Sequence, residues 1–286
     1  MRPIVIGQRL GRYRVDALLG AGGMGVVYLA SDRRGRRRVA IKVLDPNRSD
    51  RFGGESLLQE ARVAATLSHP AICAVHEVGH VGTEPFIVME HVPGVPLGTI
   101  IPSDAGLELR HAIGYTLQIV DAVAHAHRHG IVHGDLKSTN VMVVSGGAVK
   151  VLDFGLSVQR CDANGSSGVD TTRPHPTSSA CGTVPYMSPE LLRGQRADTR
   201  SDVWALGVLI FEMMAGRRPF AGATRYEVAA SILGGRQLPP PAHVPAPLAS
   251  ILAGCLAVDR EERYPSAIEL SAAVSDIVPA LSLPNA

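Results

Sequence analysis

Several side chains able to handle a proton, a phosphate charge or a divalent metal lie within one short stretch, residues 131–155. They are His133, Asp135, Lys137, Asn140 and Asp153. A carboxylate can accept a proton, a lysine can neutralise phosphate oxygens, and carboxylate and amide oxygens are ligands that Mg²⁺ prefers. Such a density of chemistry on a loop between β-like segments predicts an active site.

A second chemical signal is a glycine pattern near the start of the chain, with Gly20, Gly22 and Gly25 in the segment LGAGGMGVV. Glycines let backbone N–H groups approach phosphate oxygens without interference from a Cβ atom. Dinucleotide-binding folds share this spacing but open a helix at the last glycine, whereas here VVYLA continues as a strand. No Gly-Lys-Ser/Thr follows, so the P-loop of nucleotide triphosphatases is also excluded.

The next strand candidate carries Lys42 in the segment VAIK. Because an unpaired ammonium is costly to bury, this lysine needs an acidic partner, and Glu60 on the following predicted helix is the natural one. The alternative is a lysine whose head group simply reaches solvent at a strand end.

Two kinds of element must position these residues. Residues 10–44 alternate apolar and polar side chains, with turn signals at GAGG and RRGRR, so they predict strands. Helical spacing follows over residues 55–67 and closes before Pro70. Further strand candidates are residues 74–80 and 85–91.

Beyond Leu107 the pattern becomes helical. Apolar residues recur at intervals of three and four up to Gly130, which is placed as a helix stop. From Pro189 to the end, helical segments alternate with proline-rich breaks. A β-rich first third followed by a helical remainder predicts two lobes.

Composition excludes several classes of protein. The chain has 286 residues, 45% hydrophobic, and 28 basic against 26 acidic side chains. This near-neutral balance does not favour nucleic acid or a membrane surface as partner, and the arginines of residues 33–38 are typical of a solvated hairpin. No signal-peptide pattern opens the chain, and the longest apolar stretch, Val203–Ala215, is too short for a membrane span. Four scattered cysteines, Cys73, Cys161, Cys181 and Cys255, argue against a disulfide framework or zinc site. We therefore expect a cytoplasmic protein, or the cytoplasmic part of a longer membrane-anchored one.

In their order and over nearly the whole chain, the motifs resemble those of the protein kinase family, and within it the bacterial eukaryotic-like (Hanks-type) serine/threonine kinases. The matching pieces are LGAGGMGVV, VAIK, Glu60 before LSHPAI, IVMEHV, HGDLKSTN, DFG, GTVPYMSPE, DVWALG and DREERYPSA. The resemblance implies an α+β bilobal kinase fold, with a small β-rich N-lobe and a larger, mostly α-helical C-lobe. The expected domain covers residues 10–277: an N-lobe at 10–91, a hinge at 92–97 and a C-lobe at 98–277, with tails at 1–9 and 278–286.

The resemblance also implies roles for the chemical residues. Asp135 would orient or accept the proton of the attacking hydroxyl, and Lys137 would neutralise charge on the transferring phosphoryl group. Asn140 and Asp153 would hold Mg²⁺, with Mn²⁺ as an alternative. Lys42, fixed by Glu60, would hold the α- and β-phosphates of ATP.

An adenine pocket follows from the same resemblance. Leu19, Val27, Ala40 and Met142 would cover the ring faces, Met89 would guard the back of the pocket, and the backbone of Glu90 and Val92 would bind the base. Supporting roles fall to His133 and Phe154 as packing residues, to a buried Glu190–Arg263 ion pair, and to Asp202 as a brace for the catalytic loop.

The implied reaction is transfer of the ATP γ-phosphate to Ser and Thr hydroxyls of proteins, with self-phosphorylation and a kinase-domain homodimer as further expectations. Lys137, and Gly182-Thr183 ahead of SPE, favour serine/threonine over tyrosine acceptors. Two rival hypotheses stay open: a pseudokinase that serves as a nucleotide-binding scaffold, and a phosphotransferase acting on small molecules. The pseudokinase hypothesis predicts loss of catalytic residues, all of which are present.

One residue departs from the family pattern. Gly134 stands where the family usually has arginine, giving His-Gly-Asp in place of His-Arg-Asp. That arginine ordinarily pairs with a phosphate on the activation loop. We expect a non-RD kinase, in which phosphorylation of Thr171 or Thr172 is not the on-switch.

Overall fold

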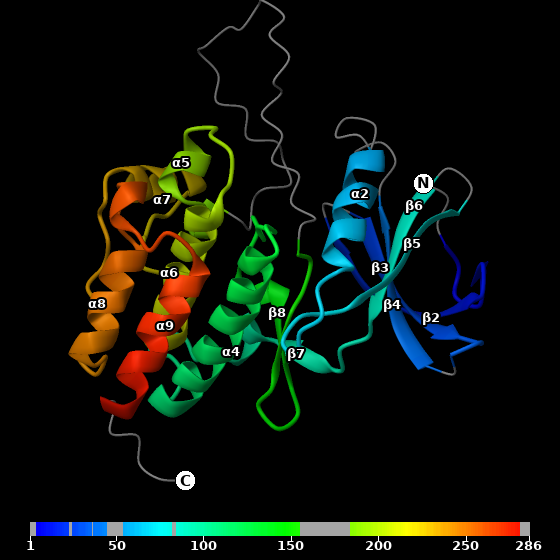
Figure 1. Cartoon of the computed structure of the whole chain (residues 1–286), viewed down its shortest axis with the longest axis horizontal. Coiled ribbons are helices and arrows are strands. Elements are labelled where there is room, and N and C mark those ends of the chain that lie inside the picture. Colours follow the sequence, from blue (N-terminus) through cyan, green and yellow to red (C-terminus); the bar gives the residue numbers. More distant parts are fainter. Residues whose placement is uncertain are drawn as a thin grey trace, which may run out of the picture.

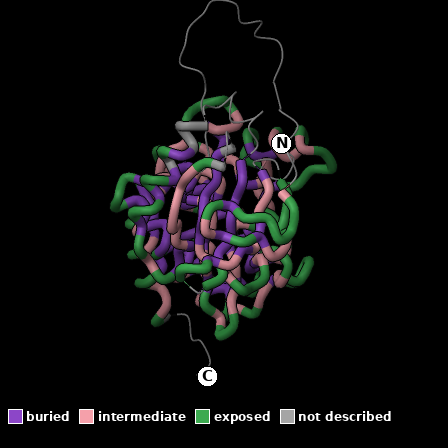
Figure 2. Tube along the Cα trace, turned by 90° about the vertical axis from the view of Figure 1, so that its right-hand side faces the viewer, coloured by how far each residue is buried: buried purple, intermediate pink, exposed green. Residues whose placement is uncertain are grey.

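The computed structural model places a sheet-rich lobe beside a helical lobe, with the β7–β8 strands and α4 between them (Figure 1). It describes residues 4–22, 25–35, 37–44, 54–81, 84–154 and 184–280. Buried segments fill the centre, and exposed turns lie at the rim (Figure 2). The predicted α+β fold of two lobes, one rich in strands and one mostly helical, is confirmed.

The N-lobe is built on an antiparallel sheet of six strands in the order β1-β2-β3-β4-β6-β5. The strands are β1 Arg9–Leu10, β2 Tyr13–Gly22, β3 Gly25–Asp32, β4 Arg37–Leu44, β5 Val75–Val81 and β6 Glu84–Glu90, and helix α2 covers Gly54–Ala64. One face packs around Tyr13, Tyr28 and Ile41, and the other packs around Leu58 of α2 with Ile87 and Met89.

Strand β4 decides where Lys42 lies. Alternate side chains of a strand point to opposite faces. Val39, Ile41 and Val43 belong to the outer cluster, whereas Ala40 and Leu44 belong to the cluster under α2. Lys42 shares the phase of Ala40 and Leu44, so the pleat directs its ammonium towards the α2 side of the sheet.

The C-lobe has a small three-stranded sheet in the order β7-β8-β9 and a set of helices. The strands are β7 Gly94–Pro96, β8 Val141–Val144 and β9 Val149–Val151; the helices are α3 Leu97–Ile100, α4 Leu109–Arg128, α5 Pro189–Leu192, α6 Thr199–Ala215, α7 Arg225–Leu233, α8 Ala246–Cys255 and α9 Ala267–Ile277. Short 3₁₀ turns cover Ser138–Asn140, Val184–Tyr186, Arg260–Glu262 and Val278–Ala280.

Helix α6 is the centre of this lobe. Every residue from Ser201 to Ala215 is buried, so the helix shows no polar stripe. A capping box at Asp198 begins it, and Gly216, with φ of 65°, ends it in the left-handed conformation. This buried helix holds Asp202 and Glu212 in the interior of the lobe.

One helix boundary differs from expectation, and one short strand was not predicted. The helix predicted over residues 55–67 ends at Ala64, because Thr66 N bonds Val63 O and Leu67 N bonds Ala64 O in tighter turns. Gly94–Pro96, within the predicted hinge, pairs with β8 as a strand. Within the described ranges, no helix has the length and apolarity needed to cross a bilayer.

Candidate active site

An ion pair between the lobes stands at the centre of the site. Lys42 Nζ lies 2.8 Å from Asp153 Oδ2, and the Lys42 side chain is only 7% exposed. Asp153 follows β9 and has a φ of 60°. Burial by itself would raise the pKa of Asp153, because it favours the neutral carboxyl. The attraction of the Lys42 ammonium is the larger effect and holds the pKa of Asp153 below its ordinary value. The Asp153 carboxyl is therefore ionised at neutral pH.

The catalytic loop gathers three predicted residues around one carboxylate. Lys137 Nζ lies 2.5 Å from Asp135 Oδ2, and Asn140 Nδ2 donates to the backbone oxygen of Asp135 at 2.9 Å. Asp135 Oδ1 is buried and has no hydrogen-bond partner among the described residues. A buried, unpaired carboxylate oxygen is destabilising unless a ligand completes it, so Oδ1 is the atom open to an incoming hydroxyl proton.

Asp202 braces this loop from below, as predicted. Its carboxylate accepts from the backbone N–H of His133 at 2.7 Å and of Gly134 at 2.8 Å. His127 Nε2 lies 2.9 Å from Asp202 Oδ2, and His127 Nδ1 accepts from Ala267 N at 3.0 Å. Because Nδ1 is an acceptor, Nε2 carries the proton and donates it to Asp202. Sequence reasoning missed His127; the available signal was a histidine on the apolar face of a predicted helix.

Gly134 occupies a backbone conformation that suits glycine. Its φ is 74°, in the left-handed region where a Cβ atom is unfavourable. The two N–H groups held by Asp202 orient the peptide immediately before Asp135. Asp202 thus sets the backbone geometry of Gly134, the residue that departs from the family pattern.

His133 and Phe154 pack together, as predicted from the sequence. Their rings lie 4.7 Å apart, and both residues are buried. His133 Nε2 donates to Leu152 O at 2.9 Å, which joins the catalytic loop to the segment leading into Asp153. The two predicted metal ligands therefore sit on segments that are tied together.

The predicted Glu190–Arg263 ion pair is confirmed. Arg263 Nη1 and Nη2 reach Glu190 Oε1 and Oε2 at 2.8 and 2.9 Å, and the guanidinium lies 4.9 Å from the centre of the Trp204 ring. Burial opposes ionisation, but the bidentate contact lowers the pKa of Glu190 to about 2. The pair fixes α5, which follows the 3₁₀ turn Val184–Tyr186.

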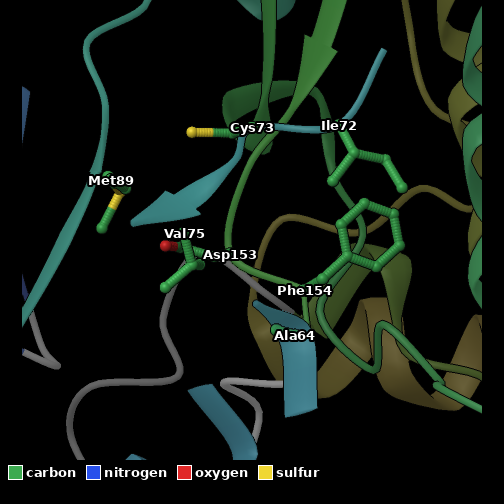
Figure 3. Close-up of a pocket in the computed structure, with 7 residues that line it drawn as sticks. All are labelled: Ala64, Ile72, Cys73, Val75, Met89, Asp153 and Phe154. Carbon is green, nitrogen blue, oxygen red and sulfur yellow. The ribbon is translucent and has the colours of Figure 1, made fainter. Parts of the chain in front are cut away.

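Four of the predicted adenine-pocket residues share one apolar cluster: Val27, Ala40, Met89 and Val92. Met89 also lines a small cavity with Cys73, Asp153 and Phe154 (Figure 3). Two other predicted residues lie apart from this cluster. Leu19 is 48% exposed on β2, and Met142 pairs with Pro96 in the C-lobe sheet.

The glycine segment forms the β2–β3 hairpin, in which Gly20 faces Val27 and Gly22 faces Gly25. A Cβ atom on Gly25 would lie 2.1 Å from Val43 O, so this glycine is required for packing against β4. At Gly20 and Gly22 a Cβ atom would meet no atom of the described residues within 4 Å. The Glu60 side chain, Gly155, Gly182, Thr183 and the Thr171–Thr172 pair lie outside the described residues.

A second bridge between the lobes was not predicted. Lys150 Nζ lies 2.8 Å from Glu90 Oε2 and donates to Ile72 O at 3.2 Å, while Ala74 N donates to Glu90 Oε2 at 3.3 Å. This contact fixes Glu90, whose backbone was predicted to bind a base. The sequence signal was a lysine between two valines of a buried strand.

The donor set fits a nucleotide-bound divalent cation. Among the described residues, no cluster of three or more His, Cys, Asp or Glu side chains could hold a metal by itself. Asn140 and Asp153 offer two hard oxygen donors, and Mg²⁺ is commonly held by one or two protein oxygens together with substrate phosphates and water.

Comparison with known proteins decides the family. The family described as "Protein kinase domain" matches residues 13–273. The chain belongs to the protein kinase family. The predicted resemblance to bacterial serine/threonine kinases is confirmed: the chain is 38% identical over 274 residues to serine/threonine-protein kinase PknB of Mycolicibacterium smegmatis, covering 91% of this chain and 42% of the relative. It is 36% identical over 279 residues to PrkC of Bacillus subtilis, covering 94% of this chain and 41% of the relative.

Among solved structures, the kinase domain of Mycobacterium tuberculosis PknI superimposes with a TM-score of 0.72 at 26% identity, covering 96% of this chain and 99% of that domain. The chain thus spans about two fifths of the length of the curated relatives but nearly all of a kinase domain.

Proposed function

We propose that this kinase domain transfers the γ-phosphate of ATP to serine and threonine hydroxyls of proteins, itself included. The observation that carries the proposal is the Asp135 carboxylate: one oxygen is held by Lys137, and the other is buried without a partner in the part of the chain that the structure describes. The relatives named above as serine/threonine kinases support the same activity.

The roles follow from the contacts. Asp135 Oδ1 accepts the proton of the attacking hydroxyl, and Lys137, held beside it, neutralises charge on the transferring phosphoryl group. Lys42 binds the α- and β-phosphates, and its present partner Asp153, together with Asn140, binds the divalent cation. That cation, Mg²⁺ or alternatively Mn²⁺, supplies charge neutralisation of the phosphates. Positioning and electrostatics therefore provide most of the rate.

The base of the nucleotide would lie against Val27, Ala40, Met89 and Val92. These side chains come from β3, β4, β6 and the segment after β6, and they belong to one apolar cluster. The Glu90–Lys150 contact, at 2.8 Å, supports the backbone of the hinge at the point where the base would bind. The proposed site thus joins apolar side chains for the base to charged groups for the phosphates.

Control of the site follows from Gly134. Because no guanidinium is present at this position, we propose that phosphorylation of Thr171 and Thr172 is not the on-switch. A Thr171→Ala, Thr172→Ala double variant should keep its activity towards an added peptide to within about twofold, since the Asp202 contacts already hold His133 and Gly134. Loss of that activity would contradict this non-RD proposal and leave the kinase assignment standing.

The acceptor class is tested with three peptides identical except for Ser, Thr or Tyr at one position, each incubated with Mg-ATP. We expect phosphate on the Ser and Thr peptides and at least about tenfold less on the Tyr peptide. Nucleotide binding without transfer to any protein or peptide would favour the pseudokinase, and transfer restricted to a small metabolite would favour the other phosphotransferase.

A further inference from the structure

A polar chain connects the catalytic loop to a cation at the surface. Ser138 lies three residues after Asp135, and its Oγ is 2.8 Å from the hydroxyl of Tyr186 in the 3₁₀ turn Val184–Tyr186. The Tyr186 hydroxyl donates to Glu212 Oε2, on the buried helix α6. Arg218 completes the chain: its Nε is 3.4 Å from Glu212 Oε1 and its guanidinium lies 5.2 Å from the centre of the Tyr186 ring.

In the ion pair at the end of this series of contacts, the cation is the more exposed partner. Burial, reinforced by the Glu212 carboxylate, raises the pKa of Tyr186 to about 12, so Tyr186 is a neutral donor at physiological pH. The Glu212 side chain is 12% exposed, whereas that of Arg218 is 43% exposed. Arg218 is therefore the counterion of Glu212, and the guanidinium of Arg218 is the group that solvent reaches.

We propose that Arg218 is a specificity-determining residue, which binds a carboxylate of an acidic side chain close to the phosphorylated residue of the acceptor protein. This inference rests on the proposed function. An extended acceptor advances about 3.3 Å per residue, so side chains a few positions from the hydroxyl at Asp135 reach past Ser138 and Tyr186. The remaining guanidinium N–H groups match a carboxylate in bidentate geometry. Because Glu212 is already paired with Arg218, a basic side chain of the acceptor at this position would be repelled by the Arg218 guanidinium.

The test is a scan of a serine peptide with Glu, Gln or Lys placed in turn at each of four positions on either side of the acceptor. For the wild-type domain we expect at least one position at which kcat/KM for Glu exceeds that for Lys by about 10-fold, the size expected for one charge-assisted contact. A wild-type domain that shows no preference for Glu at any position overturns the assignment.

Matched variants show which residue causes the preference for Glu over Lys. In Arg218→Gln, the preference for Glu should fall to about twofold or reverse towards Lys, because Glu212 loses its counterion. Arg218→Lys keeps the charge and should retain part of the preference. The control is Arg217→Gln, an equal charge change at the exposed neighbouring residue, which should leave the preference unchanged. An equal shift in Arg217→Gln would assign the effect to general surface charge and contradict the proposal.

The two levels of the proposal fail differently. If the wild-type domain phosphorylates no peptide at all, the kinase function itself fails. If it phosphorylates Glu and Lys peptides equally, only the role of Arg218 fails. A wild-type scan without a preference for Glu overturns the inference by itself, so the inference stays falsifiable even if Arg218→Gln does not fold.

Discussion

Replacing Asp202 by asparagine should both destabilise the domain and slow phosphate transfer. The Asp202 carboxylate is almost fully buried and receives three hydrogen bonds, from His133 N, Gly134 N and His127 Nε2, at 2.7, 2.8 and 2.9 Å. An asparagine has one acceptor oxygen, so its amide nitrogen must face at least one of these N–H donors.

The magnitude follows from those contacts. A hydrogen bond to a charged group contributes about 1.5–3 kcal/mol, and a buried donor left without a partner costs about 1–3 kcal/mol. With one bond lost and the others weakened, the free energy of unfolding should fall by about 3 kcal/mol. For a domain of this size the melting temperature then falls by roughly 6–12 °C. Because His133 and Gly134 precede Asp135, misplacement of its carboxylate should lower kcat by about 10²-fold.

The assay combines thermal unfolding with steady-state kinetics on one serine peptide. Asp276→Asn, the same chemical change at an exposed position of α9, is the matched control and should leave both quantities unchanged. If Asp202→Asn lost less than about 0.5 kcal/mol and kept its kcat, the proposed brace beneath the catalytic loop would be refuted.

Four further changes test other parts of the site. Lys42→Met should abolish transfer and raise the pKa of Asp153, since burial would then act without the opposing ammonium; carboxyl NMR would detect this, and an unshifted pKa would contradict the pairing. Arg263→Met should destabilise the domain by about 3–5 kcal/mol, because it leaves the Glu190 carboxylate buried without its partner; a smaller loss on thermal unfolding would show that the pair matters little. Since the folded pKa of Glu190 is lowered to about 2 from 4.5, its contribution is present above pH 4.5 and is lost as pH falls towards 2; acid-unfolding curves of Glu190→Gln should lack this component. Gly134→Ala should cost about 1–2 kcal/mol in urea unfolding because of its positive φ, and an unchanged midpoint would show that the strain is relieved.

The sequence could predict contacts that are local or that belong to the family pattern. Asp135, Lys137 and Asn140 lie within six residues, so one loop brings them together. The Glu190–Arg263 pair and the contacts of Asp202 span 73 and about 70 residues, and they were predicted only through the resemblance.

The missed contacts depend on how this particular chain packs. His127 looked like a residue of an ordinary amphipathic helix, and its partners on α6 and α9 are brought to it only by helix packing. Glu90 meets Lys150 across the two lobes, and Arg218 meets Glu212 at the end of a buried helix. The periodicity of the sequence and the spacing of its motifs do not predict such pairs. Each pair depends on how elements that are distant in sequence are placed relative to one another.

The most direct test of the account is a comparison of the wild-type domain with Asp135→Asn, measuring ATP binding and mapping phosphorylated sites after incubation with Mg-ATP. Asparagine keeps the size of the side chain but replaces the proton-accepting carboxylate, so we expect ATP affinity within about threefold of wild type and phosphate transfer lower by at least about 10²-fold. Equal phosphate incorporation by the two proteins, at the same sites, would contradict the assignment of Asp135 as the catalytic base.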